Sequence, residues 1–191
     1  MNSGLGAKDN IDTIEARVAE ARRAGAVYIL TPEMSVVFAR NRAGLQAEAE
    51  PWENNGAIAR LAGIARENGV FLHIGSLAIA LEGGRFANRS VLFDPEGEIV
   101  SRYDKIHLFD ADIDGENGYR ESATYAGGDT AVVADIAPFK LGISICYDVR
   151  FPALYRTLAT AGAQVIVVPS AFTVPTGEAH WHVLLQARAI E

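Results

Sequence analysis

The chain has 191 residues, which suits a single domain, and 49% of them are hydrophobic, which is enough for a substantial core. Its 17 basic and 24 acidic residues give a net charge of -7, which argues against nucleic acid as the main partner because phosphate binding needs a basic surface. A single cysteine excludes an intramolecular disulfide, and the most apolar stretches are too short to span a bilayer. These features predict a soluble, cytoplasmic protein that binds neither nucleic acid nor membranes.

The hydrophobic pattern predicts helices and strands that alternate at both ends of the chain, with hairpins between them. Apolar residues at helical spacing predict helices from Asn10, the expected N-cap, to Gly25, over residues 58–68, from Pro152 to residue 161, and over 178–191. Short apolar runs between turn residues predict strands over residues 26–30, 70–80, 86–93, 98–103, 130–136, 140–145 and 165–168. Residues 107–128 show neither period and predict a long loop. This order predicts an α/β fold with strands inside and helices outside.

Three reactive side chains follow the ends of predicted strands. Glu33, Lys105 and Cys146 each lie at or just past such an end. Ligands of α/β proteins bind at the carboxyl ends of strands, so a base, a cation and a thiol can meet in one crevice. Each residue also has an ordinary interpretation, as a solvated surface charge for Glu33 and Lys105 and as a small buried hydrophobic side chain for Cys146. The three residues alone leave both interpretations open.

Cys146 begins a segment that leaves a strand and enters a predicted helix. A thiol in that position lies near backbone N–H groups, which stabilise a thiolate and can hold an oxyanion. A metal site is not expected from His107, His180 and His182. The last two are two residues apart on a predicted helix and face away from each other, and the chain has no Cys/His cluster with the spacing of metal ligands.

Six segments resemble, in order, motifs of the carbon–nitrogen hydrolase (nitrilase) superfamily. They are Leu30-Thr-Pro-Glu33-Met, Tyr103-Asp-Lys105-Ile-His-Leu-Phe-Asp110, Tyr119-Arg-Glu121-Ser, Gly142-Ile-Ser-Ile-Cys146-Tyr-Asp-Val-Arg-Phe-Pro152, Pro169-Ser-Ala-Phe-Thr173 and Gly177-Glu-Ala-His-Trp181. One motif would be weak evidence, whereas six in order over nearly the whole chain are specific. The last part of the chain is most similar to the small-amide branch, which includes deaminated-glutathione amidase and ω-amidase.

The resemblance implies a four-layer αββα sandwich of two mixed sheets with a Glu-Lys-Cys catalytic triad. In such a triad, Cys146 attacks the amide carbon, Glu33 transfers protons, and Lys105 stabilises the oxyanion together with the backbone N–H of Tyr147. Glu121 resembles a second family glutamate that positions the substrate and the lysine. Ammonia leaves, water hydrolyses the remaining thioester, and the resemblance implies neither a metal nor an organic cofactor.

Substrates of this branch carry carboxylates, so the resemblance also implies a cation in the pocket. Arg150 is the candidate for that cation, and the alternative is a structural ion pair with a nearby acidic group. Phe172 and Thr173 follow a strand end and are candidates either for the pocket wall or for ordinary packing. The expected partners are therefore a small amide substrate and, as in the family, a second copy of the chain in a homodimer.

Compared with the family's pattern, residues 1–191 are expected to form one domain that lacks the first strand and the C-terminal region. An inactive shortened homologue is therefore one alternative, although the joint presence of Glu33, Lys105, Glu121 and Cys146 argues against it. A nitrilase or an N-carbamoyl amino acid hydrolase would use the same triad, and substrates alone separate these enzymes. A thiol redox protein is a further alternative, which the lack of a second cysteine disfavours.

Overall fold

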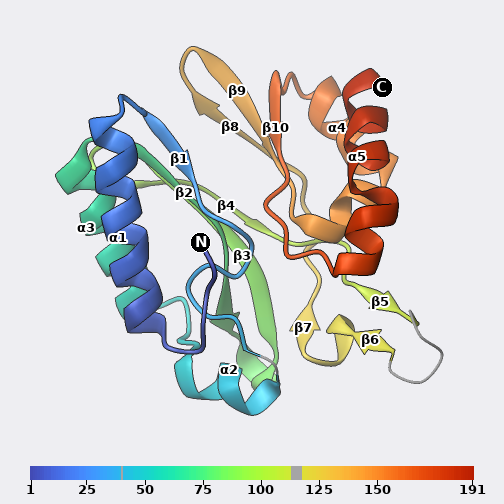
Figure 1. Cartoon of the computed structure of the whole chain (residues 1–191), viewed down its shortest axis with the longest axis horizontal. Coiled ribbons are helices and arrows are strands. Elements are labelled where there is room, and N and C mark those ends of the chain that lie inside the picture. The colour runs from blue at the N-terminus through green and yellow to red at the C-terminus, as the bar shows by residue number, and fades with distance from the viewer. Residues whose placement is uncertain (40, 113–117) are drawn as a thin grey trace.

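Two sheets lie face to face between outer helices in the computed structural model, which describes residues 1–39, 41–112 and 118–191 (Figure 1). The first layer holds the helices α1 (Ala7–Arg23) and α3 (Gly56–Asn68). The second is a sheet of β1 (Tyr28–Leu30), β2 (Phe71–Ala80), β3 (Phe86–Phe93), β4 (Ile99–Asp104) and β7 (Tyr125–Ala126). The third is a sheet of β8 (Val132–Ile136), β9 (Phe139–Ile143) and β10 (Val165–Val167), and the fourth holds α4 (Pro152–Thr160) and α5 (Val174–Ile190). The predicted αββα sandwich is confirmed.

Both sheets are mixed, as predicted. In the first sheet β1 runs parallel to β2, whereas β3 is antiparallel to both β2 and β4. In the second sheet β10 runs parallel to β9, and β8 is antiparallel to β9. The chain leaves β1 towards Glu33, β4 towards Lys105 and β9 towards Cys146, so three strand ends supply the three predicted side chains.

Each interface between layers has its own apolar core. The outer face of the first sheet packs on α1 and α3 through residues such as Ile14 and Leu61. The two sheets meet through a core that includes Leu92 and Leu141. The second sheet packs on α4 through residues such as Leu158. Helices with one apolar face and strands with two apolar faces account for this layering.

Two predicted helix boundaries are wrong. The first helix begins at Ala7, and Asn10 is not its N-cap, because the buried Asn10 side chain lies in the first turn and donates to the carbonyl oxygens of Gly4 and Val36. The last helix begins at Val174 rather than at residue 178, with a proline in its first turn, where the missing N–H costs no hydrogen bond. Asn10 therefore fixes the N-terminal segment instead of capping the helix.

Several short elements were not predicted. Helix α2 (Arg42–Glu48) was not predicted because it buries only one side chain, and a single apolar position gives no helical repeat in the sequence. The expected loop over residues 107–128 contains β5 (Asp110–Ala111), β6 (Tyr119–Arg120), the 3-10 turn η2 (Glu121–Ala123) and β7, while residues 113–117 lie outside the described part. The described helices include none that is both long and apolar enough to cross a membrane.

Candidate active site

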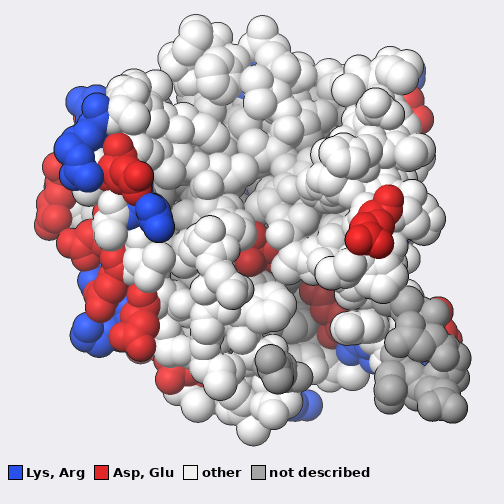
Figure 2. Space-filling model, in the orientation of Figure 1, with Lys and Arg blue, Asp and Glu red and all other residues white. Residues whose placement is uncertain are grey.

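The molecule has two halves, the first made of α1, α3 and the first sheet and the second made of the second sheet, α4 and α5. A cavity of about 610 Å³ opens between these halves. Figure 2 shows charged side chains gathered over α1 and α3, whereas the face between the halves is mostly uncharged and has acidic atoms within a hollow. All the site residues proposed from the sequence line this cavity, namely Glu33, Lys105, Glu121, Cys146, Tyr147, Arg150, Phe172 and Thr173. The fold therefore brings together residues that are up to 140 positions apart in the chain.

Glu33 enters the cavity from a tight turn that follows β1. The turn passes so close to Gly75 of β2 that a Cβ on Gly75 would lie 2.6 Å from the Pro32 carbonyl oxygen and closer still to that of Thr31. Met34, directly after Glu33, has a left-handed φ of 52°, and its N–H donates to Ser76 Oγ at 2.9 Å. These contacts fix the direction of the Glu33 side chain, which is 6% exposed.

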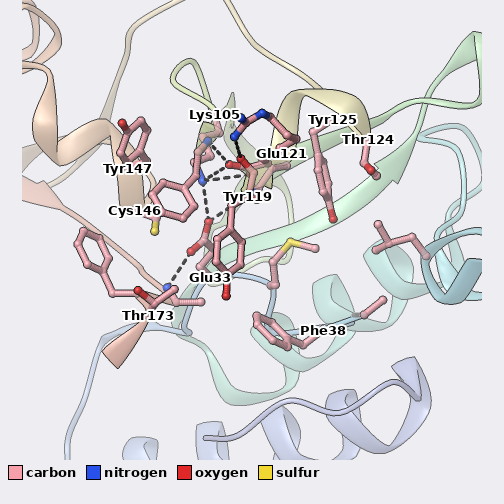
Figure 3. A pocket seen from close by; sticks show the side chains of 18 of the residues that line it. Glu33, Phe38, Lys105, Tyr119, Glu121, Thr124, Tyr125, Cys146, Tyr147 and Thr173 are labelled. Atoms are coloured by element: carbon pink, nitrogen blue, oxygen red, sulfur yellow. Dashed lines mark hydrogen bonds and ion pairs between the residues drawn. The ribbon is translucent and has the colours of Figure 1, made fainter. Parts of the chain in front are cut away.

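Glu33, Lys105 and Glu121 form a buried ionic cluster (Figure 3). The Lys105 Nζ atom lies 3.1 Å from Glu33 Oε1 and 2.9 Å from Glu121 Oε2. Burial by itself lowers the pKa of Lys105, but the negative charges of Glu33 and Glu121 and the hydrogen bond to Glu121 outweigh burial and raise that pKa. Lys105 is therefore a fixed positive charge at neutral pH, and it can stabilise an anion that forms in the cavity.

The Oε2 atoms of the two carboxylates receive backbone hydrogen bonds. Glu33 Oε2 accepts the N–H of Ala171, which follows β10, at 2.7 Å. Glu121 Oε2 accepts the N–H of Phe109 at 2.6 Å. Because Ala171 follows a strand of the second sheet, its bond connects the Glu33 carboxylate to the opposite half of the molecule. Both carboxylates are thus oriented by rigid backbone as well as by Lys105.

Cys146 begins a 3-10 turn, η3 (Cys146–Arg150), which leads into the helix predicted to begin at Pro152. Its φ of 50° is left-handed, its N–H donates to the Pro169 carbonyl oxygen at 2.9 Å, and the residue is 8% exposed. Burial, and then the negative charge of Glu33, raise the pKa of the thiol well above its usual value. The thiol is therefore protonated at neutral pH and needs a base to take its proton as it reacts.

Asp148 fixes the turn that carries Cys146. Its fully buried carboxylate accepts the N–H of Ile145 at 2.9 Å, the hydroxyl of Tyr103 at 2.7 Å, and both the backbone N–H and the Nδ1 atom of His107 at 3.0 and 2.7 Å. Tyr103 and His107 flank Lys105 in the chain, so these bonds join the turn of the thiol to the strand end of the cation. The described residues contain no group of three or more side chains placed to hold a metal ion.

The wall of the cavity beside Cys146 is aromatic and carries one arginine. The Arg150 guanidinium lies 5.7 Å from the Tyr147 ring centre and 5.9 Å from that of Phe172, and it is 3.1 Å from His180 Nδ1. Within the described ranges, Arg150 forms no ion pair with a carboxylate. Phe172 also packs against Trp181, with ring centres 4.9 Å apart, so it has both of the roles considered for it.

The family model for carbon–nitrogen hydrolases matches residues 3–191. The chain belongs to the carbon–nitrogen hydrolase family. It is 42% identical over 192 residues to a deaminated glutathione amidase of Yersinia enterocolitica, covering 99% of this chain and 66% of that protein. It is 35% identical to an omega-amidase of Xenopus laevis, covering 96% of this chain and 65% of that protein. The chain thus spans about two thirds of the length of these relatives.

Solved structures of the superfamily have the same fold as this carbon–nitrogen hydrolase. The C. elegans NitFhit protein superposes with a TM-score of 0.88 at 30% identity, covering 99% of this chain and 46% of that one. An amidase from Nesterenkonia sp. AN1 superposes with a TM-score of 0.82 at 30% identity, covering 99% and 70%. In that amidase structure, a mutant, acrylamide has added to the active-site cysteine by Michael addition.

Asn88 of β3 is a cavity residue that was not predicted from the sequence. Its side chain is buried, and its Nδ2 atom donates to Glu33 Oε1 at 3.1 Å and to Glu121 Oε1 at 3.3 Å. No motif singles it out, because its position depends on the β3–β4 register, in which the N–H of Lys105 donates to the Asn88 carbonyl oxygen at 2.9 Å. Knowledge of that register would have placed Asn88 beside Lys105.

Proposed function

We propose that the chain hydrolyses the C–N bond of small amides that carry a carboxylate, and releases ammonia through a thioester on Cys146. The observation that carries the proposal is the buried contact of Lys105 Nζ with Glu33 Oε1, at 3.1 Å, in the cavity that the chain's single thiol also lines. The relatives named as deaminated glutathione amidase and omega-amidase support an amide as the substrate.

In the first step Cys146 attacks the carbonyl carbon of the amide while Glu33 takes the thiol proton. The raised pKa of Cys146 supports this coupling, since a protonated thiol is a poor nucleophile. The positive charge of Lys105 and the backbone N–H of Tyr147 stabilise the oxyanion of the tetrahedral intermediate. Glu121, which contacts Lys105 through both of its oxygens, holds the ammonium group in place.

In the second step the intermediate breaks down and the enzyme is regenerated. Glu33 passes its proton to the departing nitrogen, the C–N bond breaks, and ammonia leaves a thioester on Cys146. Water then attacks the thioester as Glu33 takes a proton from it. The C–S bond breaks, the proton returns to sulfur, and the carboxylic acid product leaves.

Arg150 binds the carboxylate of the substrate in this proposal, and Phe172 and Thr173 contact its carbon chain. The guanidinium supports this role because it lines the cavity, forms no ion pair within the described residues and lies against the Tyr147 and Phe172 rings. A bidentate contact from such a cation would select amides that also carry a carboxylate. A cytoplasmic location and assembly into a homodimer belong to the same proposal.

The test is ammonia release by the purified chain from a panel of compounds. The panel holds the ω-amide of a dicarboxylic acid, a deaminated glutathione, a neutral amide of similar length, a nitrile and an N-carbamoyl amino acid. We expect release from the first two, and none from Cys146→Ala. Preference for the nitrile or the carbamoyl compound would replace the amidase assignment by a sibling activity. No release from a folded, monodisperse chain on any compound would contradict hydrolysis by this chain.

A further inference from the structure

We propose that Asn88 is a positioning residue that keeps the carboxylates of Glu33 and Glu121 together while Lys105 transfers a hydrogen bond to the oxyanion. This inference rests on the proposed function, because it assigns Asn88 a part in the same reaction.

All three donors of Lys105 have an acceptor in the free site. An ammonium group carries three N–H bonds. Lys105 Nζ lies within hydrogen-bond distance of three oxygens, at 3.1 Å from Glu33 Oε1, 3.1 Å from Glu121 Oε1 and 2.9 Å from Glu121 Oε2. To donate to a new oxyanion, Lys105 has to weaken or release one of these contacts. A carboxylate oxygen would then lose a donor in a buried site, which is costly.

Asn88 donates to two of the oxygens that Lys105 contacts. The Nδ2 atom of an asparagine carries two N–H bonds. Here they point to Glu33 Oε1, at 3.1 Å, and to Glu121 Oε1, at 3.3 Å. Lys105 Nζ, Glu33 Oε1, Asn88 Nδ2 and Glu121 Oε1 therefore form a closed ring of hydrogen bonds. Either Oε1 atom keeps one donor when Lys105 moves towards the oxyanion.

The amide orientation of Asn88 follows from its neighbours. Turning the amide over would place its oxygen against two carboxylates, so the NH₂ group must face them. In this orientation Asn88 Oδ1 is buried and has no hydrogen-bond partner among the described residues. A buried acceptor without a partner destabilises the fold, so stability alone does not explain an asparagine here.

Asn88 is also placed rigidly beside the lysine. It lies in β3, its carbonyl oxygen accepts the N–H of Lys105 at 2.9 Å, and the residue is 2% exposed. Residues directly opposite each other on adjacent antiparallel strands point to the same face of the sheet. Continued by one residue, the β3–β4 register places Asn88 opposite Lys105, so both side chains approach Glu33 and Glu121 from the same strand pair. Asn88 is neutral and therefore leaves Lys105 as the charge that the oxyanion meets.

Loss of Asn88 is expected to change the pH profile of the site. A carboxylate with fewer donors takes up a proton more readily, so the acid limb of any process that needs ionised Glu33 moves to higher pH. A purely structural residue would instead lower the amount of folded protein and leave the limb in place. The pH of the acid limb therefore separates the two roles.

The experiment measures two rates against pH, namely kcat/KM for the ω-amide and alkylation of Cys146 by iodomethane, which carries no amide group. Glu33→Gln is the reference variant, and it should remove the acid limb of alkylation. Asn88→Ala should move both acid limbs upward by about one pH unit and lower kcat about tenfold, with KM changed less than about twofold. Asn88→Ser, which keeps one donor, should lie between Asn88→Ala and the native chain.

Asn55→Ala is the matched control, because Asn55 is a buried asparagine that caps α3 by accepting the N–H of Ile58 at 3.0 Å and does not line the cavity. It should lower stability and leave both limbs unchanged. Acid limbs that stay in place in both Asn88 variants would overturn the inference, as would the absence of a limb in the native alkylation profile. A limb that shifts in a chain that hydrolyses no amide would contradict the proposed function and support the positioning role of Asn88.

Discussion

The two outer helices of equal length, α1 and α5, differ in how they are held. Each has 17 residues, but α1 buries residues such as Ile14 and Val18, whereas no residue of α5 is buried. Val183 in α5 is 66% exposed. The cavity shows the same difference in burial. Its ionic cluster comes from the half with the first sheet and is buried, whereas the aromatic side chains and Arg150 of the opposite wall come from the half with the second sheet and are partly exposed.

The comparison indicates that groups which must keep fixed distances lie in the tightly packed half. Lys105 and Glu33 are 2% and 6% exposed and are held by each other and by backbone. Side chains that face the substrate lie where fewer neighbours restrict them, so they can change without disturbing the cluster. Cys146 belongs to the second half, but Asp148 bonds its turn to Tyr103 and His107 of the first.

The largest effect is expected from Lys105→Met, which leaves two buried carboxylates without their cation. Breaking such a cluster should lower the free energy of unfolding by about 3–5 kcal/mol. Loss of the oxyanion donor should lower kcat by about a thousandfold. Urea unfolding and ammonia release measure the two quantities. Lys140→Met is the control, because Lys140 is 51% exposed and lies 4.0 Å from Asp135. An equal loss of stability in both variants would contradict the special position of the cluster.

Gly75→Ala should come next, because the new methyl group would meet backbone that cannot move away. The added Cβ would lie 2.6 Å from both the Pro32 carbonyl oxygen and Pro169 Cβ. We expect a loss of about 3 kcal/mol in stability, together with lower kcat as the Glu33 turn is displaced. Gly63→Ala, where a Cβ meets nothing within 4 Å, should instead raise stability by about 0.5–1 kcal/mol. A native-like Tm for Gly75→Ala would show that the turn is free to shift.

Val18→Ala and Val183→Ala compare the two helices directly with the same chemical change. Val18 is 1% exposed, so its truncation should lower stability by about 2 kcal/mol. Val183 is 66% exposed, and alanine favours helix, so that variant should stay within about 0.5 kcal/mol of the native chain. Thermal and urea unfolding of both variants provide the comparison. A loss of stability of 2 kcal/mol in Val183→Ala would mean that α5 is covered by a partner in solution.

The smallest effect is expected at the wall, from Arg150→Leu. KM for a carboxylate-bearing amide should rise about tenfold, equal to about 1.4 kcal/mol, while KM for a neutral amide of the same length stays unchanged. Arg150→Lys should raise KM less than Arg150→Leu does, since lysine keeps the positive charge but cannot form a bidentate contact with a carboxylate. Arg156→Leu, an exposed arginine of α4 that does not line the cavity, is the control. A similar rise in KM for both amides would exclude the carboxylate contact.

The sequence predicted the layers of the fold and the reactive side chains of the cavity better than it predicted the residues that hold those side chains in place. Strand ends and ordered motifs were enough to place Glu33, Lys105 and Cys146 at one crevice, because strand ends in an α/β fold share an edge. Gly75 and Asn88 were missed, since their importance comes from contacts with segments far away in the chain. The start of α1 was misplaced for the same reason, because the side chain of Asn10 binds a carbonyl oxygen 26 residues later.

Two residues of the site have a side chain although their backbone adopts the left-handed conformation that favours glycine. Met34, directly after Glu33, has a φ of 52°, and Cys146 has a φ of 50°. A left-handed conformation costs a residue with a Cβ about 1 kcal/mol, so both positions hold conformational energy that the rest of the fold must offset. Replacing either residue by glycine would therefore relax the backbone while removing a side chain from the cavity. In the described part of the chain three non-glycine residues have a left-handed φ, and two of them, Met34 and Cys146, line this cavity, whereas Asn54 does not. Most of this conformational energy is therefore held beside the thiol.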